Sequence, residues 1–151
     1  MLLYYLIALS LGIEGGYSQP AVGFNNLDPG NVFVIFVGRD LGITNIAFSL
    51  ETAFYHGKNL GYSFNTAGIR FGFYRSDWRF SPAVGFGTDY VSRAMNKNNE
   101  TSFAFNYHVG LLINFHINRL RIYPKFYYEG ITDFKKQAGF IGVNLGLDYE
   151  M

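Results

Sequence analysis

The sequence contains no cysteine, so disulfide bonds and thiolate metal ligands are excluded. Charged residues are also scarce: they make up 15% of the chain, against roughly 25% in an ordinary soluble domain. Neither sign dominates, because the formal net charge is only +1. No basic cluster with interleaved aromatic residues occurs, so the composition offers no argument for a nucleic-acid partner.

Long apolar runs are missing as well. No stretch of about 18 apolar residues occurs without polar interruption, which argues against a membrane-spanning helix. Hydrophobic residues nevertheless make up 49% of the chain, and aromatic residues make up 19%. The apolar character is therefore distributed, as in a β-barrel in lipid, whose strands present only every second residue to the bilayer. A chain of 151 residues suits a single domain that closes a small barrel.

Alternation of apolar and polar residues is the main signal in the sequence. Over 141–151, apolar residues occupy every odd position, and the even positions hold glycine, asparagine, aspartate and glutamate. Segments 101–116 and 119–129 alternate in the same way, and so, more weakly, do 45–54 and 78–90. This pattern predicts half-buried β-strands.

Two further segments depart from simple alternation. Residues 31–37 are apolar on both faces and are predicted as a strand without an orientation. Residues 61–74 change phase, since Tyr62 and Phe64 occupy even positions whereas Ile69 and Phe71 occupy odd ones. A β-bulge near 66–68 is expected to restore the register.

The N-terminal segment admits two interpretations. Its apolar run, followed by Gly16-Tyr17-Ser18, is compatible with a signal peptide. However, no lysine or arginine precedes the run, and its residues alternate, which a signal-peptide core does not require. Counting 1–18 as a strand gives eight strands, and single-chain bacterial barrels have even numbers. We therefore expect one domain over 1–151, with an export signal upstream of this numbering.

The connections between these strands are expected to differ between the two ends of the barrel. Tight connections are predicted near 38–42, 76–77 and 117–118, and longer or more polar ones near 19–30, 56–60, 94–100 and 130–136. Short turns on the periplasmic side and longer loops on the outside are typical of outer-membrane barrels.

Charged side chains indicate which face of the strands meets lipid. The polar face carries Glu14, Glu51, Arg70, Asp89, Arg121 and Lys125. The lumen of an eight-stranded barrel is only wide enough for its side chains, so charges of both signs can pair there. On the lipid face, a midplane Arg or Lys would cost roughly 2–4 kcal/mol. The polar face is therefore predicted to point inward, with His108 hydrogen-bonded in the same interior network.

Aromatic residues are expected near both ends of the strands. Toward the short turns lie Tyr5, Phe73, Trp78, Phe80, Phe115 and Tyr149, and toward the loops lie Tyr17, Phe54, Tyr62, Tyr90, Phe103 and Tyr128. Two such bands match the interfacial girdles of membrane barrels. The alternative is that aromatic residues simply favour strands.

With this pattern, the whole chain resembles the small outer-membrane β-barrels of the OmpA and OmpX type. The most specific match is the C-terminal strand. The assembly signal of that superfamily runs polar, any, Gly, any, any, aromatic, any, hydrophobic, and it fits Asn144, Gly146, Tyr149 and Met151, with Met151 at the usual phenylalanine. The resemblance implies an eight-stranded antiparallel up-and-down transmembrane barrel in the bacterial outer membrane. Its implied partners are the barrel-assembly machinery, membrane lipids and lipopolysaccharide.

No residue pattern indicates catalysis or cofactor binding. The three histidines, His56, His108 and His116, lack the spacing of metal ligands. The closely spaced His and Ser, followed by Asn, of outer-membrane lipid A deacylases are also absent. We therefore expect no catalytic residue, no metal and no cofactor.

The function that best fits these features is a non-enzymatic, membrane-anchored scaffold. Its loops would contact protein partners or lipopolysaccharide, with Lys97, Lys135 and Lys136 available for lipid phosphates. Three alternatives remain open: a lipid A-modifying hydrolase at the rim, a small ion channel, and a soluble lipocalin-like carrier with an apolar lumen.

Overall fold

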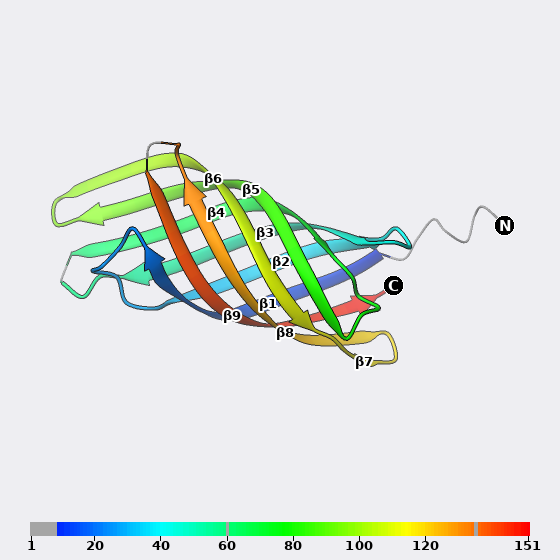
Figure 1. The fold of residues 1–151 in the computed structure, drawn as a ribbon. Helices are drawn as coiled ribbons and strands as arrows, with labels where there is room; N and C mark the ends of the chain where they lie inside the picture. Colours follow the sequence, from blue (N-terminus) through cyan, green and yellow to red (C-terminus); the bar gives the residue numbers. More distant parts are fainter. Residues whose placement is uncertain (1–8, 60, 135) are drawn as a thin grey trace.

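The computed structural model describes residues 9–59, 61–134 and 136–151, and in it the alternating segments form antiparallel strands around a closed barrel (Figure 1). The first eight residues of the expected strand 1–18, including Tyr5, lie outside the described residues, and so does Lys135. Within the described part of the chain, no helix is long and apolar enough to span a membrane.

In the described part of the chain, nine strand segments make up the sheet. They are β1 (Leu9–Val22), β2 (Gly30–Asp40), β3 (Asn45–His56), β4 (Tyr62–Tyr74), β5 (Phe80–Met95), β6 (Asn98–Ile113), β7 (Phe115–Ile117), β8 (Leu120–Thr132) and β9 (Gln137–Glu150). Segments β6 and β7 are separated only by Asn114 and both pair with β8. They therefore count as one barrel strand, and the predicted eight-stranded antiparallel barrel is confirmed.

Each strand pairs with its neighbour in sequence, and β1 pairs with β9 to complete the circle. Because the number of barrel strands is even, β1 starts and β9 ends at the same end. This "terminal end" also holds the connections 41–44, 75–79 and 118–119. The opposite "loop end" holds 23–29, 57–61, 96–97 and 133–136. In Figure 1, the start of β1 (blue) and the end of β9 (red) lie at this same end.

The prediction of long loops at the loop end is largely wrong. Residues 19–22 belong to β1, residues 130–132 belong to β8, and only 96–97 separate β5 from β6. Strand β6 pairs with β8 only from Phe105 onward, so its first residues extend beyond β8 as one arm of a hairpin (Figure 1). The polar residues of 94–100 thus mark strands that leave the apolar zone, not a loop.

The expected β-bulge near 66–68 is also absent. Strand β4 pairs with β3 and β5 without a register shift, and a shift occurs instead in β1 between Pro20 and Val22. The phase changes because Phe64 points into the lumen, where it packs against Tyr55 and Phe140. The interior is therefore apolar near the loop end, which simple apolar-out alternation does not anticipate.

The strand that the sequence left unoriented follows the same principle. In β2, the odd-numbered side chains Phe33 and Ile35 are 55% and 60% exposed, whereas the even-numbered Val32 and Val34 are buried. The outer side chains of β2 are apolar and exposed on the outside of the barrel. The inner side chains are apolar because they pack in the lumen near the loop end.

Candidate functional site in the barrel lumen

Charged side chains fill the middle of the lumen, as the alternation predicts. At the centre, Arg70 of β4 contacts two carboxylates, pairing with Glu51 of β3 at 2.6 Å and with Glu129 of β8. All three side chains are at most 4% exposed. Since β4 and β8 are not neighbours in the sheet, Arg70 joins strands across the lumen.

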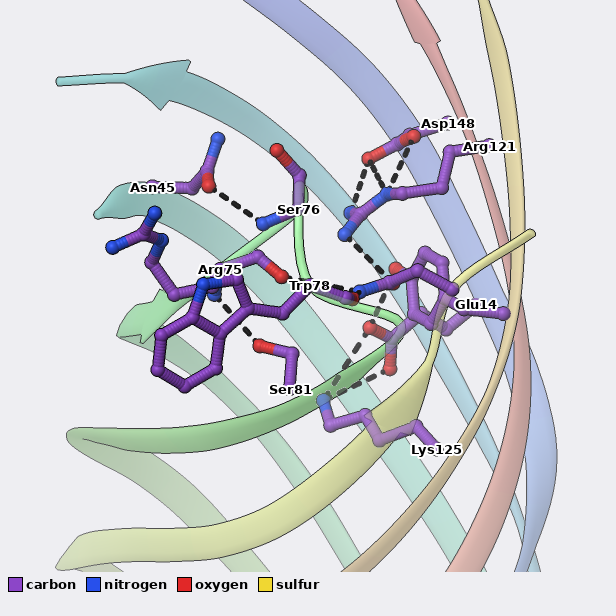
Figure 2. Close-up of polar contacts among 11 residues, drawn as sticks. Glu14, Asn45, Arg75, Ser76, Trp78, Ser81, Arg121, Lys125 and Asp148 are labelled. Atoms are coloured by element: carbon purple, nitrogen blue, oxygen red, sulfur yellow. Dashed lines mark hydrogen bonds and ion pairs between the residues drawn. The ribbon is translucent and has the colours of Figure 1, made fainter. Parts of the chain in front are cut away.

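A second group surrounds Glu14 of β1. Lys125 lies 3.1 Å from Glu14 Oε2 (Figure 2). Tyr123 Oη donates to Glu14 Oε1 at 2.9 Å. Asn144 Nδ2 donates to Oε2 at 3.1 Å. These residues come from β8 and β9, so one buried carboxylate connects three adjacent strands.

A third group lies nearer the terminal end. The Arg121 guanidinium pairs with Asp148 through two of its nitrogens, and its Nη1 donates to Asn114 Oδ1 at 3.2 Å. The guanidinium carbon lies 4.6 Å from the ring centroid of Tyr74 and 4.4 Å from that of Tyr123. Arg121 therefore satisfies its charge while packing between two aromatic rings.

Hydrogen bonds from inward side chains fasten the 75–79 connection at the terminal end. Asn114 Nδ2 donates to the carbonyl oxygens of Arg75, at 3.1 Å, and Trp78, at 2.6 Å. The Ser76 amide donates to Asn45 Oδ1 at 2.8 Å, and the Arg75 amide donates to Ser81 Oγ at 2.7 Å (Figure 2).

Outside this hydrogen-bonded group, the 75–79 connection carries an exposed ion pair. Arg75 pairs with Asp77 at 2.6 Å, and hydrogen bonds from Arg75 hold the pKa of Asp77 below its ordinary value. Because both groups are solvated, this pair contributes little to stability.

Two of the predicted interior residues, Asp89 and His108, lie in the lumen but contribute less to its ion pairs and hydrogen bonds than expected. Asp89 is 1% exposed, yet it forms no ion pair with any described residue. His108 also points inward, but its buried Nδ1 has no hydrogen-bond partner, so its predicted place in the hydrogen-bonded network is wrong. A neighbouring glycine explains the placement: a Cβ on Gly85 would lie 2.1 Å from the imidazole ring.

The sequence reasoning omitted several members of the network. Glu129 and Asp148 are 2% exposed and complete the ion pairs of Arg70 and Arg121, while Tyr123 and Asn114 supply hydrogen bonds. The signal for the two acids was present, since both occupy inward positions in the alternation of their strands. What alternation could not supply is the pairing partner, which depends on the closure of the barrel.

Apolar clusters flank this charged middle on both sides. Toward the loop end lie Leu27, Val32, Val34, Ala53, Tyr55, Phe64, Val91, Ala104, Ile131, Ala138 and Phe140, here called the loop-end cluster. Toward the terminal end lie Phe36, Ala47, Tyr74, Ala83, Leu112 and Tyr123. Between them is a cavity of about 40 Å³ beside Glu14, Arg70 and His108, enough for roughly one or two water molecules.

Comparison with known proteins bears on the fold. No protein-family model matches the sequence, and no curated protein matches it. Among solved structures, the attachment invasion locus protein Ail of Yersinia pestis is 14% identical, with a TM-score of 0.64 over 97% of this chain and 100% of Ail. The N-terminal barrel domain of Pseudomonas aeruginosa OprF is 12% identical, with a TM-score of 0.61 over 93% of this chain and 97% of that domain.

Neisserial surface protein A is 10% identical, with a TM-score of 0.58 over 95% of this chain and 96% of its own. This chain has the fold of the small outer-membrane β-barrels. At these identities the likeness concerns the fold alone. It carries no information about the roles of individual side chains in this chain.

Within this small-barrel fold, most of the predicted interfacial aromatic residues point outward near the strand ends. The exposed ones are Tyr17, Phe54, Tyr90 and Phe103 toward the loop end, and Trp78, Phe80, Phe115 and Tyr149 toward the terminal end; Tyr128 is half-buried. Tyr62 differs, because it has the inward phase of Phe64 and packs against the loop-end cluster. Its predicted outward position is wrong for the same reason as the predicted bulge.

Proposed function

We propose that this protein is a bacterial outer-membrane barrel that acts as a non-enzymatic, membrane-anchored scaffold. The observation that carries this proposal is the reversal of the usual distribution of side chains. Leu50, Val84 and Leu145 are 50–62% exposed on the outside, while Arg70, Arg121 and Asp148 are 1–2% exposed on the inside.

An exterior covered with apolar side chains is stable in contact with lipid. Exposed apolar side chains occur on every strand of the barrel, whereas monomeric soluble proteins rarely expose contiguous apolar patches above a few hundred Å². A closed barrel leaves no unpaired sheet edge within the lipid, which is the requirement for strands to span it. The fold shared with Ail, OprF and NspA favours the bacterial outer membrane as the location.

The alternatives fit the interior less well. A soluble lipocalin-like carrier needs an apolar, open lumen, and this lumen is charged and filled. A channel needs a continuous path, and apolar clusters lie on both sides of the charged middle. A rim hydrolase needs an activated hydroxyl, yet within the described ranges no histidine is hydrogen-bonded to a serine or a carboxylate.

The loop end is the surface that we propose for partners. The exposed lysines of the described residues, Lys58, Lys97 and Lys136, all belong to this end, whereas Arg39, Arg75, Arg79 and Arg119 belong to the terminal end. Lysines that project beyond the apolar zone suit the phosphates of lipopolysaccharide or another polyanion. Ail has been solved in complex with the heparin analogue sucrose octasulfate, which favours testing polyanions here.

We further propose that the barrel-assembly machinery recognises β9. Tyr149 and Met151 are 47% and 59% exposed on the outward face. Gly146 faces inward, where a Cβ would lie 2.2 Å from the ring of Tyr123. The glycine of the signal therefore also makes room for a buried tyrosine.

Heat-modifiability tests the central proposal. The protein is refolded in detergent, and unboiled and boiled samples are compared by SDS gel electrophoresis. We expect a mobility shift on boiling, because a closed barrel resists the detergent until it is heated. A monomer that is folded and soluble without detergent and shows no shift would overturn the proposal.

Cysteine labelling in intact cells tests the location and orientation. Because the sequence contains no cysteine, a single substitution gives a unique label site. Lys97→Cys at the loop end should react with a membrane-impermeant maleimide, and Asp77→Cys at the terminal end should react only after the outer membrane is opened. The reverse labelling pattern would contradict the proposed orientation.

A further inference from the structure

A pocket opens at the loop end, above the filled part of the lumen. Its volume is about 450 Å³, within the range typical of small-molecule sites. Its floor is apolar, formed by Phe64, Ala104, Ile131 and Ala138. Its polar lining comes from Arg93, Glu100, Thr101, Ser102, Asp133, Lys136 and Gln137. The pocket thus has one apolar side and one side that can recognise a charge.

Arg93 provides a positively charged group in the lining of the pocket. It follows Val91 at the next inward position of β5 and lies between two rings, with its guanidinium carbon 5.7 Å from the centroid of Phe24 and 5.7 Å from that of Tyr62. Tyr62 Oη accepts a bond of 3.3 Å from Nη2, but the buried Nε has no hydrogen-bond partner. The rings hold the guanidinium in place without neutralising it.

No ion pair among the described residues includes Arg93, although the carboxylates of Glu100 and Asp133 line the same pocket. Glu100 is the cross-strand partner of Arg93 in the β5–β6 ladder, yet it is exposed, and none of the five ion pairs of the described residues includes either residue. In the charged middle of the lumen, by contrast, each arginine has its carboxylate partner. A half-buried guanidinium that forms no ion pair with a described residue therefore lines the pocket.

We propose that this pocket binds a small anionic amphiphile, with its carboxylate or phosphate head on Arg93 and its apolar body on the floor formed by Phe64, Ala104 and Ile131. Arginine presents donors in a fork that matches both kinds of anionic head. The floor offers apolar contacts that a purely hydrophilic anion would not use. The inference goes beyond the scaffold role and does not require that the loop tips contact lipopolysaccharide.

Amide chemical shifts test this site directly. Isotope-labelled protein in phosphatidylcholine nanodiscs is titrated with octanoate, and partition into lipid is measured with empty nanodiscs. We expect saturable shifts at the amides of Gly23, Ala104 and Ala138. Octanol, which has the same tail without the charge, and inorganic phosphate, which has a charge without the tail, should each bind at least about tenfold more weakly.

Variants separate the contributions of charge and floor. Arg93→Gln should weaken octanoate binding by about tenfold or more, because a charged hydrogen bond is lost. Arg39→Gln removes an exposed cation at the terminal end that does not line the pocket, and it should leave the affinity unchanged. Ala104→Leu keeps Arg93 but fills part of the floor, and it should also weaken octanoate. The heat-induced gel shift verifies that each variant is folded.

Three results would overturn the proposal. One is unchanged octanoate affinity in Arg93→Gln. Another is equal affinity for octanol and octanoate, which would make the site a general apolar crevice. The third is inorganic phosphate binding as tightly as octanoate, which would show that the floor takes no part and that the site serves hydrophilic anions.

Discussion

Arg70 illustrates how single residues stabilise this barrel. Its guanidinium is buried between Glu51 and Glu129, which lie on strands that are not neighbours. Buried ion pairs contribute little net stability by themselves, but the loss of one partner leaves an uncompensated charge. The importance of Arg70 is therefore best measured by removing it alone and then together with its carboxylates.

We expect Arg70→Met to lower the free energy of unfolding by about 3–5 kcal/mol. Without the guanidinium, Glu51 and Glu129 are two buried acids with no cation between them. Carboxyl groups take up protons as the pH falls, so the loss should be smaller at pH 5 than at pH 8. Urea unfolding in lipid vesicles, followed by the fluorescence of Trp78, measures both values.

Two controls accompany this measurement. Arg75→Met removes an arginine whose partner, Asp77, is 59% exposed, and it should change stability little. The triple variant Glu51→Gln, Arg70→Met, Glu129→Gln should recover much of the lost stability. A loss that is independent of pH and persists in the triple variant would point to packing and not to charge.

At the scale of the element, glycines allow the strands to carry large side chains into a narrow lumen. An ideal Cβ on Gly87 of β5 would lie 1.9 Å from the carbonyl oxygen of Ile69 in β4, so the backbone itself leaves no space. At Gly72 of β4, the nearest atom would be 4.0 Å away. Of these two inward glycines on adjacent strands, Gly72 therefore has room for a Cβ and Gly87 does not.

Gly87→Ala should therefore destabilise the barrel by about 1–3 kcal/mol, because the strands must shift to accept the methyl group. Gly72→Ala should stay within about 0.5 kcal/mol of the wild type, because its side chain enters free space. Equilibrium unfolding in vesicles compares the two. Equal losses in both variants would show that the backbone contacts at Gly87 relax freely.

The C-terminal strand carries a second prediction at this scale. If β9 is the assembly signal, Tyr149→Ala should slow the appearance of heat-modifiable barrel in cells, whereas Met151→Phe should equal or exceed the wild type. Tyr17→Ala is the matched control, since it removes another outward tyrosine, 62% exposed, from β1. Pulse-labelling followed by unboiled gels gives the rates. Equal slowing by Tyr17→Ala would indicate a general aromatic effect.

For the whole molecule, the decisive feature is that the lumen is filled. A charged middle, two apolar clusters and the fastened 75–79 connection leave a cavity of about 40 Å³. A barrel of eight strands is only wide enough for its side chains. This filled lumen supports the proposal that the molecule is a membrane-anchored platform whose open surface is the loop end.

Planar bilayers test this view. We expect the reconstituted wild-type protein to show no stepwise conductance above the leak of the lipid, because side chains of the described residues fill the lumen. Protein recovered from the bilayer preparation should still show the heat-induced gel shift, which excludes simple failure to insert. Reproducible single-channel steps would contradict the filled lumen.

The alternation of β6, β8 and β9 was sufficient to predict an eight-stranded barrel with charges inside, because the strand period of two is a local property of the backbone. It also placed Glu14, Arg70 and Arg121 in the lumen. The C-terminal signal and the outer-membrane location stay predictions, since the likeness in fold does not test them.

What the amino-acid order determined by itself is which side chains share a face, since neighbours in a strand alternate sides whatever the fold. The tertiary structure alone decided which charges meet, because Arg70 reaches Glu129 only when β6 and β8 close the circle. It also decided that Phe64 and Tyr62 turn inward. Their environment is an apolar cluster at one end of the lumen, and this cluster exists only after the barrel has closed. The same holds for the pocket that Arg93 lines.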